Sequence, residues 1–270
     1  MFNRRHQVHA DEGERPFWIS YADMMTASMT LFLVMMAAFI AINTKNLNNY
    51  TSDQKKAQAR QVKINEIMAK IAEKLKKEPF TEKYQVQVNV EPPSIDMGGI
   101  CEFKQSDYSL REDQLKMLRQ VVNNDVVDVI SSIDSATQWV KSVDVVGFAS
   151  SEGSYLTNLG MSQARSAFMV CSLLEKPAGK QGQEKAKFRT FVRSKFQVAA
   201  FSENNLVQTG NNLSDSKKRQ NRIKSRRAEL RIIFHSVAEM EELNKQGNQQ
   251  PDRLDNDLGA CKDVWAVFRK

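Results

Sequence analysis

An aspartate near the start of a long apolar segment is the residue whose position most directly suggests chemistry. Asp23 lies in the stretch FWISYADMMTASMTLFLVMMAAFIAI, and no charged residue follows it from Met24 to Thr44. A carboxyl group in a medium of low dielectric constant favours its neutral form, so it can take up and release a proton. Asp23 is therefore predicted to carry a proton or another cation. The alternative is an aspartate that simply faces lipid headgroups.

The helical neighbours of Asp23 support the first interpretation because all of them are small or hydroxylated. At three residues before, and three, four and seven residues after Asp23, the sequence has Ser20, Thr26, Ala27 and Thr30. Residues at these spacings share one face of a helix. A face of small residues allows a second helix to approach closely. Asp23 is thus predicted to face a partner helix or a water-filled path.

The segment around Asp23 has the length of a membrane span. Its uncharged part, at ~1.5 Å per residue, measures ~30 Å, which is one hydrocarbon thickness. A cleaved signal peptide would have a shorter apolar core. We assign a transmembrane helix to residues 17–43, after a tail of residues 1–16. Arg4, Arg5 and Arg15 favour a cytoplasmic location for this tail and a periplasmic location for the rest of the chain.

Beyond the span, the pattern predicts a helical linker and then a folded domain. Residues 44–79 lack glycine and, before Pro79, proline, and their apolar residues recur mostly at helical spacing, which predicts a linker or stalk helix. From residue 80 to 270, strands and helices interleave, which predicts an α+β fold, a mixed sheet with helices on one side. We expect strands at 84–90, 140–150, 197–202 and 226–234, and helices at 111–133, 162–176 and 189–196. Residues 236–270 are polar and loop-like, except for the last eight.

Composition argues against catalysis and nucleic-acid binding. The formal net charge is +7 and the pI is about 9.2, which permits an anionic partner but does not choose one. No basic run is interleaved with aromatic residues. The three histidines and three cysteines show no metal-ligand spacing, and no nucleophile–base set is evident. We therefore expect no enzyme activity, no metal and no cofactor.

The stretch WISYADMMTASMTLFL resembles the B-subunit helix of flagellar stators and their relatives: an aromatic residue, Tyr-Ala-Asp, Met-Thr-Ala, then an apolar run. In that family the aspartate carries the ion of a motor driven by ion-motive force, and Asp23 matches it. The resemblance implies a B subunit that transports H⁺ or Na⁺ in the inner membrane. It also implies that the subunit pairs as a homodimer inside a ring of A-type, MotA-like subunits.

Two downstream stretches resemble the peptidoglycan-binding domain of the outer-membrane protein A family. They are GFASSEGSYLTNLGMSQARSAFMV and NRIKSRRAELRI. The resemblance implies that Asn158 and Arg165 bind peptidoglycan. A guanidinium grips a carboxylate with two parallel hydrogen bonds, and an amide offers both donor and acceptor. The alternative for Arg165 is a surface ion pair on a helix.

The second resemblance is imperfect at three positions of the implied site. Ser150 stands where the family has its binding aspartate, Thr157 precedes Asn158, and Met161 replaces the leucine of a Leu-Ser pair. Without the aspartate, the contact to an amine of the stem peptide should weaken.

A periplasmic domain permits disulfide bonds. Since Cys261 lies outside the core of the expected fold, a bridge from it to Cys101 or Cys171 would staple the tail to the domain.

Two branches of the stator family fit these features: the flagellar stators, and the B subunits of Zorya anti-phage defence complexes. We favour the Zorya branch, because the span lacks the usual tryptophan after its motif, the binding aspartate is replaced by Ser150, and the cysteines suit a stapled tail. In that system, ion flow through the complex is thought to signal infection to cytosolic effectors. A passive peptidoglycan anchor is a further alternative, but it leaves Asp23 unexplained.

Overall fold

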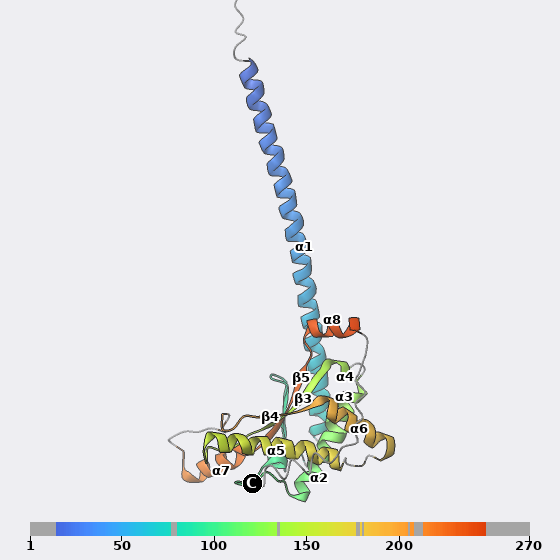
Figure 1. The fold of residues 1–270 in the computed structure, drawn as a ribbon, viewed down its shortest axis with the longest axis vertical. Coiled ribbons are helices and arrows are strands. Elements are labelled where there is room, and N and C mark those ends of the chain that lie inside the picture. The colour runs from blue at the N-terminus through green and yellow to red at the C-terminus, as the bar shows by residue number, and fades with distance from the viewer. Residues whose placement is uncertain are drawn as a thin grey trace, which may run out of the picture. The chain divides into compact units, whose positions relative to one another are not determined.

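The computed structural model describes residues 15–76, 80–133, 136–176, 179, 181–204, 206–207 and 213–246 (Figure 1). The chain forms two compact units, Met1–Gln58 and Ala59–Lys270. The predicted N-terminal tail, apart from its last two residues, and the predicted C-terminal tail from residue 247, with Cys261, lie outside the described residues.

The first helix, α1 (Arg15–Leu75), is 61 residues long. Its length follows from the sequence, because neither glycine nor proline occurs between Phe17 and Glu78. In the first unit, its described side chains are all exposed, as expected for an apolar helix whose surroundings are lipid or other proteins. Among the described residues, α1 is the one helix that is long and apolar enough to cross a membrane.

The second unit begins inside α1. A face of its last turns is buried in the hydrophobic core of the domain and consists of Ile64, Ile67, Met68, Ile71 and Leu75. These residues recur every three or four positions and so form one stripe of the helix. The sequence predicted a separate linker over residues 44–79. The structure instead places the boundary between Gln58 and Ala59, because this stripe needs an apolar partner and finds it in the domain.

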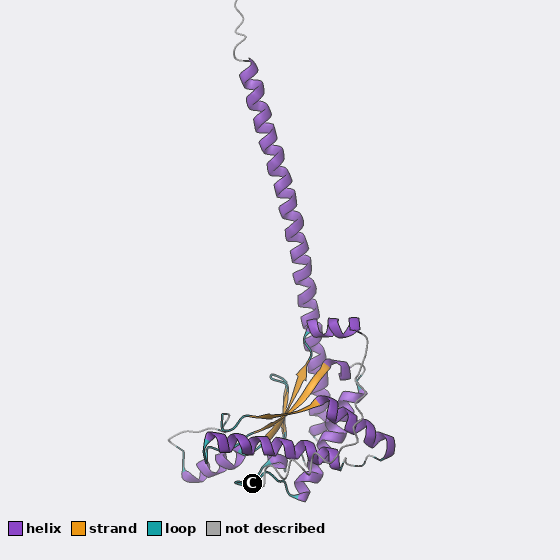
Figure 2. Ribbon diagram, in the orientation of Figure 1, coloured by secondary structure: helices purple, strands orange, loops and turns teal. Residues whose placement is uncertain are grey.

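A five-stranded sheet forms the centre of the second unit (Figure 2), with strand order β1-β2-β5-β3-β4. The strands are β1 (Gln87–Asn89), β2 (Ser94–Asp96), β3 (Val140–Gly147), β4 (Phe196–Ala200) and β5 (Ala228–Phe234). Only the β3–β4 pair is parallel. The sheet is therefore mixed, and the predicted α+β class is confirmed.

Nine further helical segments follow α1 among the described residues. They are the 3₁₀ helix η1 (Gly98–Cys101), α2 (Glu112–Gln120), the π-helical η2 (Val121–Val127), α3 (Asp128–Ser132), α4 (Ala136–Trp139), α5 (Tyr155–Glu175), α6 (Gly182–Lys195), α7 (Asp215–Ser225) and α8 (Val237–Gln246). The predicted helices correspond to α2–η2–α3, α5 and α6. The sequence did not predict α7. The prediction of a loop directly after residue 235 was wrong, because α8 begins there.

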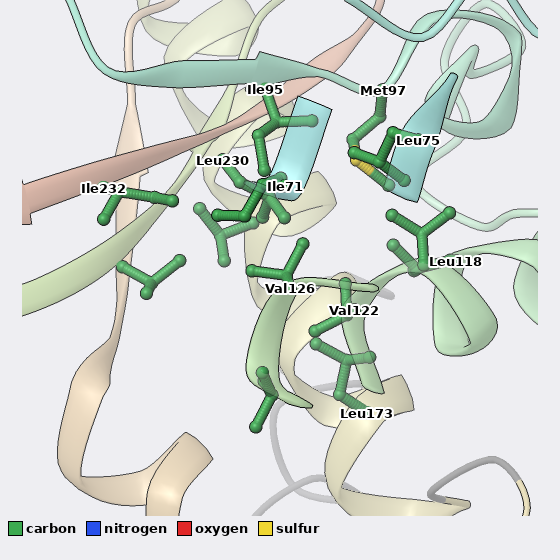
Figure 3. Close-up of a cluster of buried hydrophobic side chains, with 14 of the residues drawn as sticks. Ile71, Leu75, Ile95, Met97, Leu118, Val122, Val126, Leu173, Leu230 and Ile232 are labelled. Atoms are coloured by element: carbon green, nitrogen blue, oxygen red, sulfur yellow. The ribbon is translucent and has the colours of Figure 1, made fainter. Parts of the chain in front are cut away.

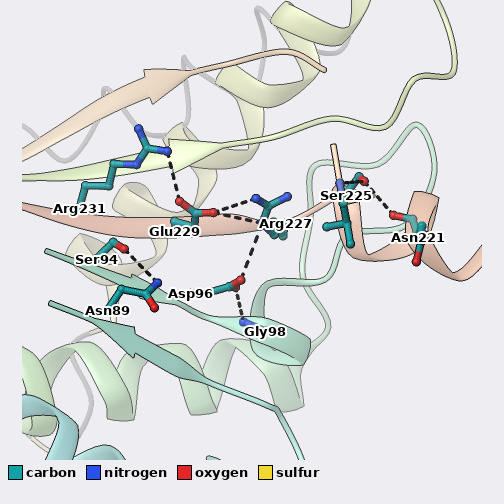
Figure 4. A network of polar contacts seen from close by, with 10 residues as sticks. Asn89, Ser94, Asp96, Gly98, Asn221, Ser225, Arg227, Glu229 and Arg231 are labelled. Atoms are coloured by element: carbon teal, nitrogen blue, oxygen red, sulfur yellow. Dashed lines mark hydrogen bonds and ion pairs between the residues drawn. The ribbon is translucent and has the colours of Figure 1, made fainter. Parts of the chain in front are cut away.

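The two faces of the sheet differ in chemistry. On one face, Val145 of β3 lies opposite Leu230 of β5. Both belong to the hydrophobic core, to which the last turns of α1, η2, α5 and α6 also contribute (Figure 3). The opposite face carries Arg227, Glu229 and Arg231, which form a chain of ion pairs (Figure 4). Strand alternation explains this division, and the prediction that helices cover one side of the sheet is confirmed.

Candidate functional site

On the face of α1 that carries Asp23, the hydroxyl groups of both threonines are satisfied within the helix. Thr26 donates from Oγ1 to the carbonyl oxygen of Ala22 at 2.6 Å, and Thr30 donates to Ala27 at 2.9 Å. Buried polar groups without partners are costly in hydrocarbon, so these bonds make the face compatible with close helix packing. Asp23 itself is exposed on the single chain, where a partner subunit can reach it.

The candidate site of the second unit lies where β3 ends and α5 begins. The strand ends at Gly147, and a Cβ atom at this position would collide with the carbonyl oxygen of Ser162 on α5. Only glycine lets the helix and the strand approach this closely. The first part of the connection that follows, Phe148 to Ser150, is buried, and its backbone N–H groups at Phe148 and Ala149 donate to the carbonyl oxygens of Arg227 and Ser202.

Ser154 starts α5 as its N-cap. Its Oγ accepts a hydrogen bond from the backbone N–H of Thr157 at 3.3 Å and lies 2.8 Å from the Thr157 hydroxyl. A serine in extended conformation at this position satisfies one of the free N–H groups of the first turn. Thr157 is therefore fixed at the exposed start of the helix.

Arg165 is buried below this connection, with only 2% of its surface exposed. Its guanidinium donates to three backbone carbonyl oxygens, those of Phe148 at 2.9 Å, Asp107 at 3.1 Å and Lys104 at 3.2 Å. It also stacks over the Phe103 ring, 5.2 Å from its centroid. Arg165 thus joins the 103–107 segment, the end of β3 and α5.

Burial, reinforced by the nearby charge of Arg226, lowers the pKa of Arg165 to about 10. The group therefore remains a cation at neutral pH. In this conformation Arg165 is neither the surface ion pair that was the alternative nor an open clamp, because three of its N–H groups are already donated to the backbone. Its geometry is that of a residue that positions the site.

Ser150, which stands where the peptidoglycan-binding family has its aspartate, has a carboxylate nearby. Ser150 is buried, and its hydroxyl donates to Oε2 of Glu152 at 3.2 Å. The same carboxylate pairs with Arg222 at 3.3 Å and with Arg226 at 3.4 Å. Two guanidinium groups therefore compensate one carboxylate, and the local charge is positive.

Asn158 turns towards a second carboxylate. It is buried and donates from Nδ2 to Oε2 of Glu203 at 2.6 Å. Glu203 lies in the turn that follows β4, next to the end of β3, because these strands are parallel neighbours. Met161, one turn further along α5, is half-buried.

The fold thus gathers Ser150, Asn158 and Arg165 around the 148–154 connection. The sequence did not identify the three partners Glu152, Glu203 and Arg222. Glu152 lies in the quoted motif and is a charged residue two positions from Ser150, which is the signal that could have found it. Glu203 is 45 positions from Asn158, and Arg222 is 70 positions from Glu152, so only the fold reveals those contacts.

The structure also bears on a metal site and on the cysteines. Within the described part of the chain, no group of three or more His, Cys, Asp or Glu side chains could hold a metal ion. Cys101 and Cys171 are buried in the second unit, and burial raises the pKa of the Cys101 thiol well above its usual value. The proposed bridge to Cys261 stays a prediction, since Cys261 lies outside the described residues.

Comparison with known proteins agrees with the first resemblance. Residues 3–58 match the family described as "Membrane MotB of proton-channel complex MotA/MotB". Together with α1 and the α+β domain, this match defines a membrane-anchored, MotB-like B subunit. The Zorya protein ZorB of Escherichia coli O139:H28 (strain E24377A / ETEC) is 30% identical over 228 residues, which cover 84% of each chain. The chain therefore belongs to the ZorB family.

Solved structures of low similarity match parts of the chain. The periplasmic domain of Helicobacter pylori MotB is 10% identical, with a TM-score of 0.36, over 61% of this chain and 99% of that chain. The peptidoglycan-associated lipoprotein of Burkholderia pseudomallei is 11% identical, with a TM-score of 0.30, over 50% and 88%.

Proposed function

We propose that this chain is the B subunit of an ion-motive-force-driven membrane complex, with Asp23 as the residue that carries H⁺ or Na⁺. The proposal includes a ring of A-type, ZorA- or MotA-like subunits around a homodimer of this chain. The observation that carries it is α1 itself. This helix bears a lone carboxyl group on a small, hydroxylated face of an apolar segment, and its last turns belong to the core of the α+β domain.

The proposed orientation puts the N-terminus in the cytoplasm and the α+β domain in the periplasm. Three arginines before the span support it. In this orientation, the domain lies where peptidoglycan is available.

We assign peptidoglycan anchoring to the 148–154 connection and the first turns of α5. In this assignment, Thr157 and Met161 line the accessible side, Ser150 and Asn158 supply hydrogen-bonding groups, and Arg165 holds the segments together. An anchored frame lets the ion-driven part of the complex do work against the wall. A passive anchor would use the same domain but would have no use for Asp23.

We assign the complex to anti-phage defence because the match to the ZorB relative extends over 228 residues, 84% of this chain. The test is phage plating on cells that carry the complete system with Asp23→Asn, which keeps the size of the side chain and removes its titratable group. The expected result is loss of protection at normal protein levels. Asp53→Asn is the matched control, because it makes the same chemical change on an exposed position of α1 beyond the apolar segment.

Full protection by the Asp23→Asn variant would refute ion carriage. The flagellar alternative is tested by deletion of the gene. Loss of swimming with unchanged phage plating would favour a flagellar stator.

A further inference from the structure

The positive charge of the chain is concentrated on α7 and the two residues that follow it. Seven basic residues and one acidic residue lie between Asp215 and Arg227. The whole chain has a net charge of +7, so this short segment accounts for an excess almost as large as that of the complete protein. Such a concentration is the electrostatic footprint of an anionic partner.

Three of these basic side chains are exposed and unpaired within the described part of the chain. Lys217, Arg219 and Lys224 are exposed, and none has an ion-pair partner within the part of the chain that the structure describes. By contrast, Lys218 pairs with Asp215 at 3.7 Å. Arg219 lies three residues before Arg222, so these like charges are neighbours on the helix surface and lower its stability. A ligand of opposite charge would offset this repulsion.

The basic helix is continuous with the candidate wall site. Arg222 of α7 and Arg226, directly after it, both pair with Glu152 of the 148–154 connection. The carboxylate closest to Ser150 is thereby compensated within the protein. Glu203 accepts a hydrogen bond from Asn158, and Glu152 is neutralised by two guanidinium groups, so the cations of α7 beside the site form an excess that attracts carboxylates.

The chemistry of α7 also decides between possible anionic partners. Membrane-surface helices need a broad apolar face, but the one large apolar residue of α7 is Ile223, which is half-buried. Nucleic-acid-binding surfaces combine cations with exposed aromatic residues on which bases stack, and α7 has none. A carboxylate-bearing polymer next to the 148–154 connection fits both observations.

We propose that the exposed cations of α7 form a second contact with peptidoglycan, one that selects the free carboxylates of its stem peptides. This inference rests on the proposed anchoring function and adds its chemical selectivity. The contact is electrostatic, so its strength falls as salt screens the charges.

The experiment measures sedimentation of the purified full-length protein with peptidoglycan sacculi over a range of salt concentrations. The test variant is K217Q/R219Q/K224Q. The matched control is K83Q/K116Q/K187Q, which removes the same charge from exposed lysines elsewhere on the domain. We expect the test variant to bind about tenfold more weakly and with less dependence on salt, while the control binds like the wild type.

A second arm uses sacculi whose carboxylates have been converted to amides by carbodiimide coupling. The wild type should then bind about as weakly as the α7 variant binds to native sacculi. Equal binding of wild type, test variant and control to native sacculi would overturn the inference and leave the anchoring function intact. Absence of wild-type sedimentation with native sacculi would overturn the anchoring function itself.

A third arm uses vesicles of phosphatidylglycerol. If binding to these vesicles depends on α7 and binding to amidated sacculi is unchanged, the partner of α7 is a lipid surface and not peptidoglycan. That result would refute the proposal.

Discussion

Arg60 donates a hydrogen bond of 2.7 Å from Nε to the backbone carbonyl oxygen of His235. A second bond runs from its Nη2 to the carbonyl oxygen of Phe234 at 3.3 Å. Arg60 thereby ties α1, at the start of the second unit, to the end of β5. The stripe from Ile64 to Leu75 is buried in the same core, so these turns of α1 are part of the domain.

Replacing Arg60 by alanine should lower the free energy of unfolding of the purified full-length protein by about 1–2 kcal/mol, because two partly buried carbonyl oxygens lose a charged donor. Denaturant titration measures the change. Lys55→Ala, at an exposed position of the same helix, is the control and should leave the transition unchanged. Equal transitions for the two variants would mean that Arg60 does not hold α1 to β5.

Gly147 is expected to be intolerant of any side chain. Gly147→Ala should destabilise the domain by at least ~2 kcal/mol, because the new methyl group forces α5 away from β3. At Gly160, inside α5, a Cβ would meet no atom within 4 Å apart from its own helix backbone, so Gly160→Ala should be neutral or stabilising by up to ~1 kcal/mol. A Gly147→Ala variant as stable as Gly160→Ala would contradict the close approach of helix and strand.

Arg165 should contribute to stability as well as to wall binding. Arg165→Ala leaves three carbonyl oxygens without their donor and should cost about 2–3 kcal/mol of unfolding free energy. Arg222→Ala, which removes one exposed ion pair, should cost less than ~1 kcal/mol. If Arg165 were only a ligand clamp, Arg165→Ala would abolish sedimentation with sacculi without any change in the unfolding transition.

Acid should weaken the domain through His235. Burial and the positive charges of Lys195 and Lys141 lower the pKa of His235 below its ordinary value of 6.5. The negative charge of Glu239 opposes this shift only in part. Just below pH 6.5, the unfolded chain therefore binds more protons at this position than the folded chain, and stability rises with pH through that window. Unfolding titrations at about pH 5 and about pH 7 should show this rise, and His235→Asn should reduce it. An identical pH dependence in both proteins would exclude His235 as its source.

The sequence predicted the elements whose patterns are long and local. The apolar run around Asp23, the alternation of β5 and the helical periodicity of α5 depend on neighbours along the chain, and the structure has all three. The basic helix α7 was not predicted because it has almost no apolar face, and periodicity needs one. The burial of Arg165 could not be predicted either, since its acceptors lie 17 to 61 positions away in the sequence.

For the candidate site, too, the local motif could be predicted from the sequence, whereas the contacts between distant residues could not. The motif around Asn158 identified the correct region, but the contacts that define its charge are made by Glu203 and by the arginines at the end of α7. These residues meet only because β3 and β4 are parallel neighbours and α7 leads into β5. A pattern at the sequence level cannot supply such distances, whereas the replacement of an aspartate by Ser150 already indicated altered chemistry.

Ion carriage by Asp23 is the central claim, and ion flux is the measurement that tests it most directly. The complex of this chain with its A-type subunits is reconstituted in liposomes that contain a pH-sensitive or sodium-sensitive dye, and an ion gradient is imposed. We predict flux of one of the two ions through the wild-type complex and through the Asp53→Asn control, and background flux through Asp23→Asn. Equal flux through the wild-type and Asp23→Asn complexes would contradict the account.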